Sequence, residues 1–315
     1  MSIRVFAPAS MGNVSVGYDL LGGAVAPIDG TLLGDFVSLN EITQGIKVST
    51  VGSFAHKLPS DPKQNILYDC AVQYRKQLDA KGITYQGVEL ILEKELPVGS
   101  GLGSSAASVV AALYGLNEFY NNALTKHEML LLMGQLEGQI SGSVHYDNVA
   151  PSYLGGLQLM VEHESTLCST IPSFENWYWV LAYSGAKVPT AEARALMPTQ
   201  IELKTALTFG RNLAAFIDAS HRQDSDLAAA LLVDVIAEPV RAPIIPKFSE
   251  NKAAMLELGA IASGISGSGP TLFAVTDSLE KAQELETYLK QNYLQTDDGF
   301  SHICKLDTQG ARREA

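Results

Sequence analysis

The chain has 315 residues, and 46% of them are hydrophobic, which is enough for a substantial core in two domains or one large one. Its 34 acidic and 22 basic side chains leave a net charge of -12, which disfavours nucleic acid and anionic membranes as main partners. The three cysteines, Cys70, Cys168 and Cys304, are widely spaced and fit reduced thiols in a cytoplasmic protein better than a disulfide framework.

The first half of the chain is expected to combine strands with helices. Residues 1–8 predict a strand rather than a signal peptide, and no apolar run is long enough to span a membrane. Further strands are expected at 33–39, 46–51, 88–92 and 154–161, and helices at 66–78, 104–120 and 126–140. The polar segment 163–175, broken by Pro172, predicts a boundary between an N-terminal domain at 1–164 and a C-terminal domain at 165–315.

The second half shows the same mixture of patterns. Strands are expected at 179–183, 260–265, 271–275 and 301–306, and helices at 190–196, 199–220, 226–235, 251–258 and 279–291. Strands and helices mixed in this way indicate an α+β fold rather than strict βαβ alternation.

The most informative segment is a glycine-rich loop between an expected strand and an expected helix. It consists of Pro97, Val98, Gly99, Ser100, Gly101, Leu102, Gly103, Ser104, Ser105, Ala106 and Ala107, followed by Ser108. Glycines let the backbone approach a ligand closely, and the free N–H groups and dipole at a helix start favour an anion. The segment therefore predicts a phosphate site, with a tight turn that binds no ligand as the alternative.

Neither of two familiar phosphate loops is present. The P-loop requires a lysine after its glycines, and none follows here. The dinucleotide fingerprint fails because Ser104 stands where its third glycine should be. A phosphate site in this acidic chain must therefore use backbone N–H groups, serine hydroxyls, a metal and a few cations.

Three further segments carry polar side chains in unusual density. Asn13 and Asp19 lie in a glycine-rich stretch at 8–22, which indicates a shaped loop, although an Asx-turn to their own backbone explains them as well. Glu137 borders the apolar face of the helix at 126–140, where it is either solvated or bound to a cation such as Mg²⁺. His145, Asp147 and Asn148 follow it closely, in a cluster too dense for an ordinary turn.

The second half adds a third glycine segment and two arginines. Residues 266–271 (SGSGPT) connect two expected strands, either as a plain hairpin or as a second wall of a phosphate pocket. Arg194 and Arg241 are suited to grip a carboxylate or phosphate, although surface ion pairs are the alternative for each.

These segments, in this order, resemble the small-molecule kinase superfamily of galactokinase, homoserine kinase, mevalonate kinase and phosphomevalonate kinase. The superfamily likeness lies in PASMGNVSVGYD at 8–19, PVGSGLGSSAAS at 97–108 and GISGSGPT at 264–271. Within the superfamily the chain most resembles the homoserine kinases, through LEGQISGSVHYDNVAPSYLGG at 136–156, TAEARALMP at 190–198 and IAEPVR at 236–241. One departure is Gly12 before Asn13, where alanine is usual, which adds freedom to the loop that places Asn13.

The resemblance implies a two-domain fold and a reaction. The N-terminal, ATP-binding domain would be like ribosomal protein S5, and the C-terminal, substrate domain ferredoxin-like. The reaction would be ATP-dependent phosphorylation of L-homoserine in threonine biosynthesis, by a cytoplasmic enzyme that uses Mg²⁺. Nucleic acid and membrane would not be partners, and a homodimer is allowed.

The resemblance also implies roles for individual residues. The loop at 97–107 would wrap the phosphates of ATP, and Ser104 or Ser105 would hold Mg²⁺ together with Glu137. The implied catalytic residues are Asn148, Asn13 and Glu137. The implied amino-acid site consists of Asn13, Asp19, His145, Asn148, Arg194 and Arg241. In it, the two arginines would bind the α-carboxylate and Asp19 the ammonium group, while Asn148 would lie near the reacting hydroxyl.

Two points stay open at this level. Asparagine cannot act as a base, so we expect Asn148 to orient the hydroxyl while its proton passes to phosphate or water, with Asp147 as the alternative base. A sister kinase for another small alcohol, such as mevalonate, and a binding protein without activity are the alternative functions.

Overall fold

The structure is a computed structural model that describes residues 2–188 and 190–314. Its strands are β1 (Ser2–Pro8), β2 (Ser10–Gly12), β3 (Leu21–Pro27), β4 (Gly34–Ile42), β5 (Ile46–Val51), β6 (Gly87–Glu93), β7 (Leu157–His163), β8 (Thr166–Ile171), β9 (Tyr178–Tyr183), β10 (Ala262–Ile265), β11 (Leu272–Thr276), β12 (Phe300–Leu306) and β13 (Arg312–Arg313). Its α-helices are α1 (Ile66–Ala80), α2 (Ser104–Phe119), α3 (Lys126–Ser141), α4 (Val149–Leu154), α5 (Thr190–Ala195), α6 (Leu203–Arg222), α7 (Ser225–Leu231), α8 (Glu238–Arg241), α9 (Phe248–Glu257) and α10 (Leu279–Asn292). Short 3₁₀ turns lie at Ala55–Lys57, Pro62–Gln64 and Ala242–Ile244.

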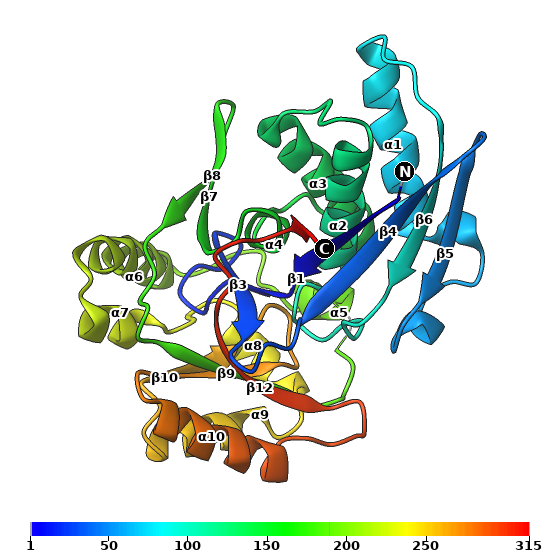
Figure 1. The fold of residues 1–315 in the computed structure, drawn as a ribbon. Coiled ribbons are helices and arrows are strands. Elements are labelled where there is room, and N and C mark those ends of the chain that lie inside the picture. Colours follow the sequence, from blue (N-terminus) through cyan, green and yellow to red (C-terminus); the bar gives the residue numbers. More distant parts are fainter. Residues whose placement is uncertain (1, 189, 315) are drawn as a thin grey trace.

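The first sheet has the strand order β13-β1-β4-β6-β5, in which only the β5–β6 pair is parallel. The chain returns to this sheet at its end, where Arg312 and Arg313 pair with Phe6 and Val5. The two termini therefore lie close together at one edge of the sheet (Figure 1).

The second sheet has the order β10-β11-β9-β12-β3-β7-β8, and β2 pairs with β3 outside this path. Strand β3 from the first half pairs with β12 from the second half, with Val25 opposite Leu306. Helix α9 packs on β10 and β11, and α10 packs on β9 and β12, below this sheet in Figure 1. The second sheet therefore joins both halves of the chain.

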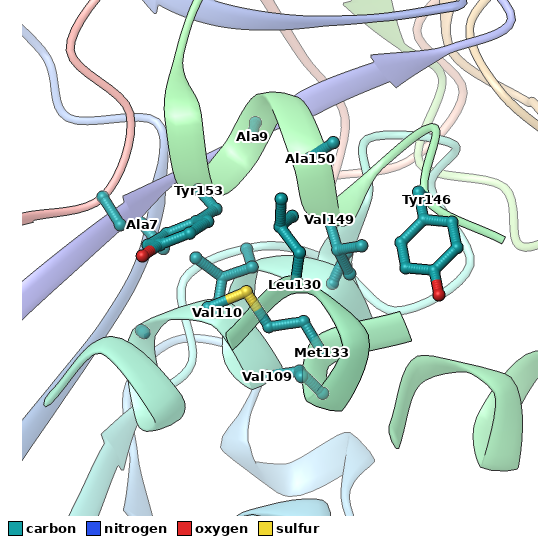
Figure 2. Close-up of a cluster of buried hydrophobic side chains, with 14 of the residues drawn as sticks. Ala7, Ala9, Val109, Val110, Leu130, Met133, Tyr146, Val149, Ala150 and Tyr153 are labelled. Carbon is teal, nitrogen blue, oxygen red and sulfur yellow. The ribbon is translucent and has the colours of Figure 1, made fainter. Parts of the chain in front are cut away.

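Helix α2 forms the centre of the first half because nearly all of its side chains are buried. It packs against β1 and β4 of the first sheet and against α1, α3 and α4. Figure 2 shows Val109 and Val110 of α2 facing Met133 of α3 and Val149 of α4. A helix that is apolar on every side must be enclosed by neighbours, and this packing fixes the start of α2 in space.

The helix boundaries follow local capping chemistry. The Asn65 side chain accepts the backbone N–H of Leu67 and begins α1. Thr125 and Glu128 form a complete capping box at the start of α3. These caps lie where the sequence predicts helix starts.

The expected α+β class is confirmed, and most of the expected elements are present. The stretch expected as a loop at 8–22 contains β2 and the start of β3, and helix α4 occupies 149–154, before the strand expected from 154. The polar segment at 163–175 contains β8, which pairs with β7. The domain division at 164/165, which falls in the turn of this hairpin, stays a prediction.

None of the helices in residues 2–188 and 190–314 combines the length and the apolar character of a membrane-spanning segment.

Candidate active site

The glycine-rich loop connects β6 to α2, as the sequence predicts. Gly99, Gly101 and Gly103 have φ values of 73°, 80° and 63°, which L side chains rarely adopt. Gly103 is also the N-cap of α2, and a Cβ there would lie 2.1 Å from the Ser10 hydroxyl oxygen. The glycines are therefore required both by the turn and by the close approach of neighbouring groups.

A buried ion pair lies beneath this loop. The Lys94 Nζ donates to Asp35 Oδ2 at 2.5 Å, to the Ser104 carbonyl at 2.7 Å and to the Ser108 hydroxyl at 3.0 Å. Asp35 Oδ1 accepts the backbone N–H groups of Glu95 and Leu96 at 3.0 and 2.9 Å. These bonds tie the end of β6 to the first turn of α2, so they hold the loop between them. The sequence analysis missed both charged residues, because they lie 59 positions apart.

The hairpin at 266–271 lies against the loop. The Ser266 hydroxyl donates to the Gly101 carbonyl, and the Thr271 hydroxyl donates to the Ser100 carbonyl, both at 2.7 Å. Gly267 and Ser268 line the same cavity as the loop. The hairpin therefore forms a second wall of this cavity, and the binding of phosphate there stays a prediction.

A serine and a glutamate form the candidate metal site. The Ser105 hydroxyl donates to Glu137 Oε1 at 2.6 Å, and Glu137 is only 6% exposed. Burial raises the pKa of Glu137 to about 7, and the Ser105 hydrogen bond opposes this increase. A buried carboxylate next to a hydroxyl oxygen is a fitting donor set for Mg²⁺. The Ser104 hydroxyl instead donates to the Leu96 carbonyl at 3.1 Å, so the geometry favours Ser105 as a ligand.

Within residues 2–188 and 190–314, no group of three or more His, Cys, Asp or Glu side chains could hold a metal ion. Mg²⁺ in phosphoryl-transfer sites commonly has one or two protein ligands, and phosphate oxygens and water complete its coordination. The Ser105–Glu137 pair fits that kind of site.

Asn148 lies where the glycine-rich loop meets the N-terminal strands. Its Oδ1 accepts the Ser10 hydroxyl at 3.0 Å, and its Nδ2 donates to Asp147 Oδ2 at 3.2 Å. A Cβ built on Gly103 would lie 2.9 Å from Asn148 Oδ1. Asn148 therefore adjoins the start of α2 and faces the cavity that the loop lines.

Asp147 and His145 are both buried beside it. Asp147 is 4% exposed, and burial, followed by the charge of Asp19, raises its pKa to about 7. Burial lowers the pKa of His145, which keeps its imidazole neutral at pH 7. The His145 Nδ1 lies 3.6 Å from Asp147 Oδ1, and among the described residues neither ring nitrogen makes a hydrogen bond. His145 lines the cavity, where its ring is suited to a polar ligand.

Asn13, Asp19, Arg194 and Arg241 meet although they come from distant parts of the sequence. Arg194 pairs with Asp19, with its Nη2 3.1 Å from Asp19 Oδ1. Arg241 is buried and donates to the Gly267 carbonyl at 2.9 Å, to which the Asn13 amide also donates at 3.3 Å. The structure thus assembles one carboxylate, two guanidinium groups and an amide in one place.

The sequence analysis gave a bond to the local backbone as the alternative for Asn13, and an ion pair as the alternative for Arg194, and both contacts are present. Asn13 Oδ1 accepts the backbone N–H of Asp19 at 3.0 Å, as an internal loop bond would. The ion pair of Arg194 is with Asp19, itself a candidate substrate residue, and not with a remote surface carboxylate. Gly12 allows close packing, since a Cβ there would lie 2.4 Å from Asp147 Oδ2.

One cavity of about 440 Å³ runs along the glycine-rich loop. Its lining combines the polar side chains of Ser105, Glu137 and Asn148 with the apolar side chains of Leu58, Pro59, Ile66, Leu92 and Val98. The sequence analysis did not assign these apolar residues to the site, apart from Val98.

Two family models match the chain. The model of the GHMP kinases N terminal domain matches residues 65–156, and that of the GHMP kinases C terminal domain matches residues 213–295. The first match contains the glycine-rich loop, Glu137 and Asn148.

Solved structures give a consistent result. A homoserine kinase from Cytophaga hutchinsonii is 34% identical, with a TM-score of 0.89, and the match covers 99% of this chain and 97% of that chain. A candidate homoserine kinase from Listeria monocytogenes is 21% identical, with a TM-score of 0.71 and 99% of each chain covered. The mevalonate kinase of Methanococcus jannaschii is 18% identical, with a TM-score of 0.68 and 97% and 98% covered. The last two likenesses concern the fold alone.

Together, the two family matches and the full-length likeness at 34% identity confirm the expected two-domain kinase fold. The chain belongs to the GHMP kinase family.

Proposed function

We propose that this GHMP kinase transfers the γ-phosphoryl group of ATP to the side-chain hydroxyl of L-homoserine, with Mg²⁺, to give O-phospho-L-homoserine for threonine biosynthesis. One observation carries the proposal: Asn148 lies beside the start of α2, and Asp147, to which its amide donates, interacts with the charges of Asp19, Arg194 and Arg241. A phosphate donor on the loop and an amino-acid acceptor bound by these three charged groups would thus meet at Asn148. The likeness to the Cytophaga hutchinsonii homoserine kinase supports the same acceptor.

The loop is suited to bind the phosphate chain. The first N–H groups of α2 have no partner within the helix, and the helix dipole adds partial positive charge at this end. Apolar side chains of the cavity lining, among them Ile66 and Leu92, would accept the flat face of a nucleotide base. A phosphate group bound at the start of α2 would lie near Ser105, Glu137 and Asn148.

Ser105 and Glu137 would hold the metal. When bound, Mg²⁺ neutralises charge on the phosphate oxygens and helps to orient the transferred group. Glu137 has to be ionised for this role, and the positive charge of a bound ion would lower its raised pKa.

Asn148 would orient the acceptor hydroxyl, since its amide can donate and accept hydrogen bonds but cannot take a proton. Its Nδ2 is held by Asp147, which is buried behind it and is not among the residues that line the cavity. We therefore keep the hypothesis that the hydroxyl proton passes to phosphate or water, because phosphoryl transfer depends mainly on positioning and charge neutralisation.

The acceptor site suits a zwitterion. Asp19 would bind an ammonium group, and Arg194 and Arg241 would bind a carboxylate through charge-assisted hydrogen bonds. In this structure Asp19 and Arg194 bind each other. The ammonium and carboxylate groups of a zwitterionic amino acid can pair with Asp19 and Arg194 in place of their bond to each other, so both side chains keep an opposite charge. An uncharged alcohol cannot do this.

The test is a coupled assay of ADP release with purified protein, ATP, Mg²⁺ and a panel of small alcohols. L-Homoserine is expected to be turned over with a kcat/KM at least about 10²-fold above those of mevalonate and of homoserine analogues lacking one charge, since each lost charged contact costs about 1.5–3 kcal/mol. Preference for an uncharged alcohol or for mevalonate would refute the proposed acceptor. No turnover with any alcohol would refute the kinase reaction itself.

Replacing Arg194 or Arg241 with alanine is expected to raise the KM for homoserine by about 10- to 10²-fold, because each removes a charge-assisted bond. The KM for ATP should change much less, since neither arginine lines the cavity of the phosphate loop. Steady-state kinetics with each substrate varied in turn measures the difference. An equal rise in both KM values would contradict the carboxylate-binding role.

Asp147→Asn separates the two proton routes. If Asn148 orients the hydroxyl and Asp147 is not the base, kcat should stay within about tenfold of the wild-type value, because the amide preserves the size of the side chain. The measurement is kcat with both substrates saturating. A loss of about 10²-fold or more in kcat, with little change in KM, would make Asp147 the base.

A further inference from the structure

A short connector joins β9 to α5 and passes the phosphate loop. Ser184, at the start of the connector, is buried. The Ser184 carbonyl accepts the backbone N–H of Gln295 at 2.8 Å, and the Ser184 hydroxyl accepts the backbone N–H of Ala186 at 3.3 Å. At the far side of the connector, Val188 is 3% exposed and donates its N–H to the Gly99 carbonyl at 3.4 Å. The connector is therefore fixed on both sides of Lys187.

The Lys187 side chain lies across the glycine-rich loop. Its Cγ and Cε are 3.2 and 3.6 Å from the position that a Cβ on Gly99 would occupy. Gly99 has a φ of 73°, which L side chains rarely adopt. Because glycine has no side chain, the aliphatic part of Lys187 can occupy the space beside it. Lys187 is exposed and lines the cavity, which leaves its ammonium group able to reach a ligand.

The other cations near the site are already engaged. Lys94, the second lysine that lines the cavity, donates to Asp35, Ser104 and Ser108. Arg194 is paired with Asp19, and Arg241 is bonded to the Gly267 carbonyl. Across the part of the chain that the structure describes, no hydrogen bond or ion pair is recorded for Lys187. It is therefore the cation that remains for an anionic ligand in this cavity.

The ligand that fits is a polyphosphate. The loop offers backbone N–H groups but has no P-loop lysine, and a protein with a net charge of -12 needs a local cation to bind a nucleoside triphosphate. An ammonium group beside the loop would neutralise phosphate oxygens that the backbone N–H groups leave exposed.

We propose that Lys187, which lies in the second half of the protein, binds the phosphate groups of ATP. It would have the role that the P-loop lysine has in P-loop proteins. The connector leads directly into α5, which carries Arg194, so one segment would contact both substrates. This inference rests on the proposed function only in requiring that ATP binds in the cavity, and it does not depend on which alcohol is phosphorylated.

Binding measurements on the full-length protein test the proposal. Dissociation constants for ATP with Mg²⁺, without acceptor, and for adenosine are measured by calorimetry for wild type, Lys187→Met and Lys187→Arg. Lys187→Met is expected to weaken ATP binding by about 10- to 10²-fold and to leave adenosine binding unchanged, because one charge-assisted contact to phosphate is lost. Lys187→Arg should retain most of the ATP affinity. Lys204→Met, at an exposed lysine of α6 outside the cavity, is the matched control and should bind both ligands normally.

Salt dependence gives a second readout. The difference in ATP affinity between wild type and Lys187→Met should shrink as potassium chloride rises from about 0.05 to 0.5 M, because salt screens an exposed ammonium–phosphate contact. ATP binding equal to wild type in Lys187→Met, or equal losses for ATP and adenosine, would overturn the assignment.

The same data separate this inference from the proposed acceptor. If the wild-type protein binds ATP but does not phosphorylate homoserine, the acceptor is wrong and the comparison of Lys187 variants still decides the role of the lysine. If the wild-type protein does not bind ATP, both proposals fail.

Discussion

Glu137→Gln is expected to lower kcat by about 10²- to 10³-fold, because a metal contributes several kcal/mol to the stabilisation of charge on the transferred phosphate. The glutamine keeps the size of the side chain and can still accept the Ser105 hydroxyl, but it carries no charge for the ion. The variant should therefore need a higher Mg²⁺ concentration for half-maximal activity. Steady-state rates measured over a Mg²⁺ titration give both values.

Folding should not be the cause of that loss. Burial raises the pKa of Glu137 to about 7, so the neutral amide removes a charge that the folded protein disfavours when no metal is bound. Thermal unfolding without metal should show a variant at least as stable as wild type. The matched control is Glu250→Gln, at an exposed position of α9, which should leave kcat and Mg²⁺ dependence unchanged. A Glu137→Gln enzyme with near-normal kcat and the wild-type Mg²⁺ dependence would show that this carboxylate does not hold the metal.

Lys94→Met is expected to cost about 3–5 kcal/mol in the free energy of unfolding, because it leaves the buried Asp35 carboxylate without its cation. Both side chains are at most 2% exposed, and each also bonds to the segment that leads into or out of the loop. Since whole domains are stable by only about 5–15 kcal/mol, this is a large effect. Urea denaturation followed by circular dichroism measures it.

The double variant Asp35→Asn/Lys94→Met shows whether the loss of stability comes from the unpaired Asp35 charge or from the lost packing of the lysine side chain. Asparagine can keep the acceptor for the N–H groups of Glu95 and Leu96 while it removes the unpaired charge, so the double variant should be more stable than Lys94→Met alone. Lys63→Met, at an exposed lysine, should change stability by less than about 0.5 kcal/mol. A double variant less stable than Lys94→Met would mean that the carboxylate does not depend on Lys94.

Local signals predicted the parts of the fold that depend on neighbouring residues. The starts of α1, α2 and α3 follow from an asparagine cap, a glycine loop and a capping box, each contained within a few residues. The apolar spacing of 104–120 and 126–140 predicted two helices, and the structure has them within one residue at each end. Such features are predictable because their hydrogen bonds and their periodicity are encoded in consecutive residues.

The misses share a physical cause. Strand β3 is rich in glycine and alanine, and it is a strand because β2, β7 and β12 pair with it, not because of its own propensity. Strand β8 is polar on much of its length, and its pairing with β7 overrides that composition. Gly12 was expected to add backbone freedom to a loop, but in the structure it lies in strand β2 beside Asp147.

The sequence by itself determined the chemical types in the site: a glycine-rich loop without a lysine, a carboxylate on a helix, and a set of amide, carboxylate and guanidinium groups. Only the tertiary structure decided which of them meet. It turned the Ser104 hydroxyl to the Leu96 carbonyl and that of Ser105 to Glu137, paired Arg194 with Asp19, and placed Lys187 across the loop. The reason is that local chemistry is set by adjacent residues, whereas contacts between residues that are not neighbours in the sequence depend on how the sheets and α2 pack. The apolar part of the cavity lining comes from residues outside any motif, and it was decided in the same way.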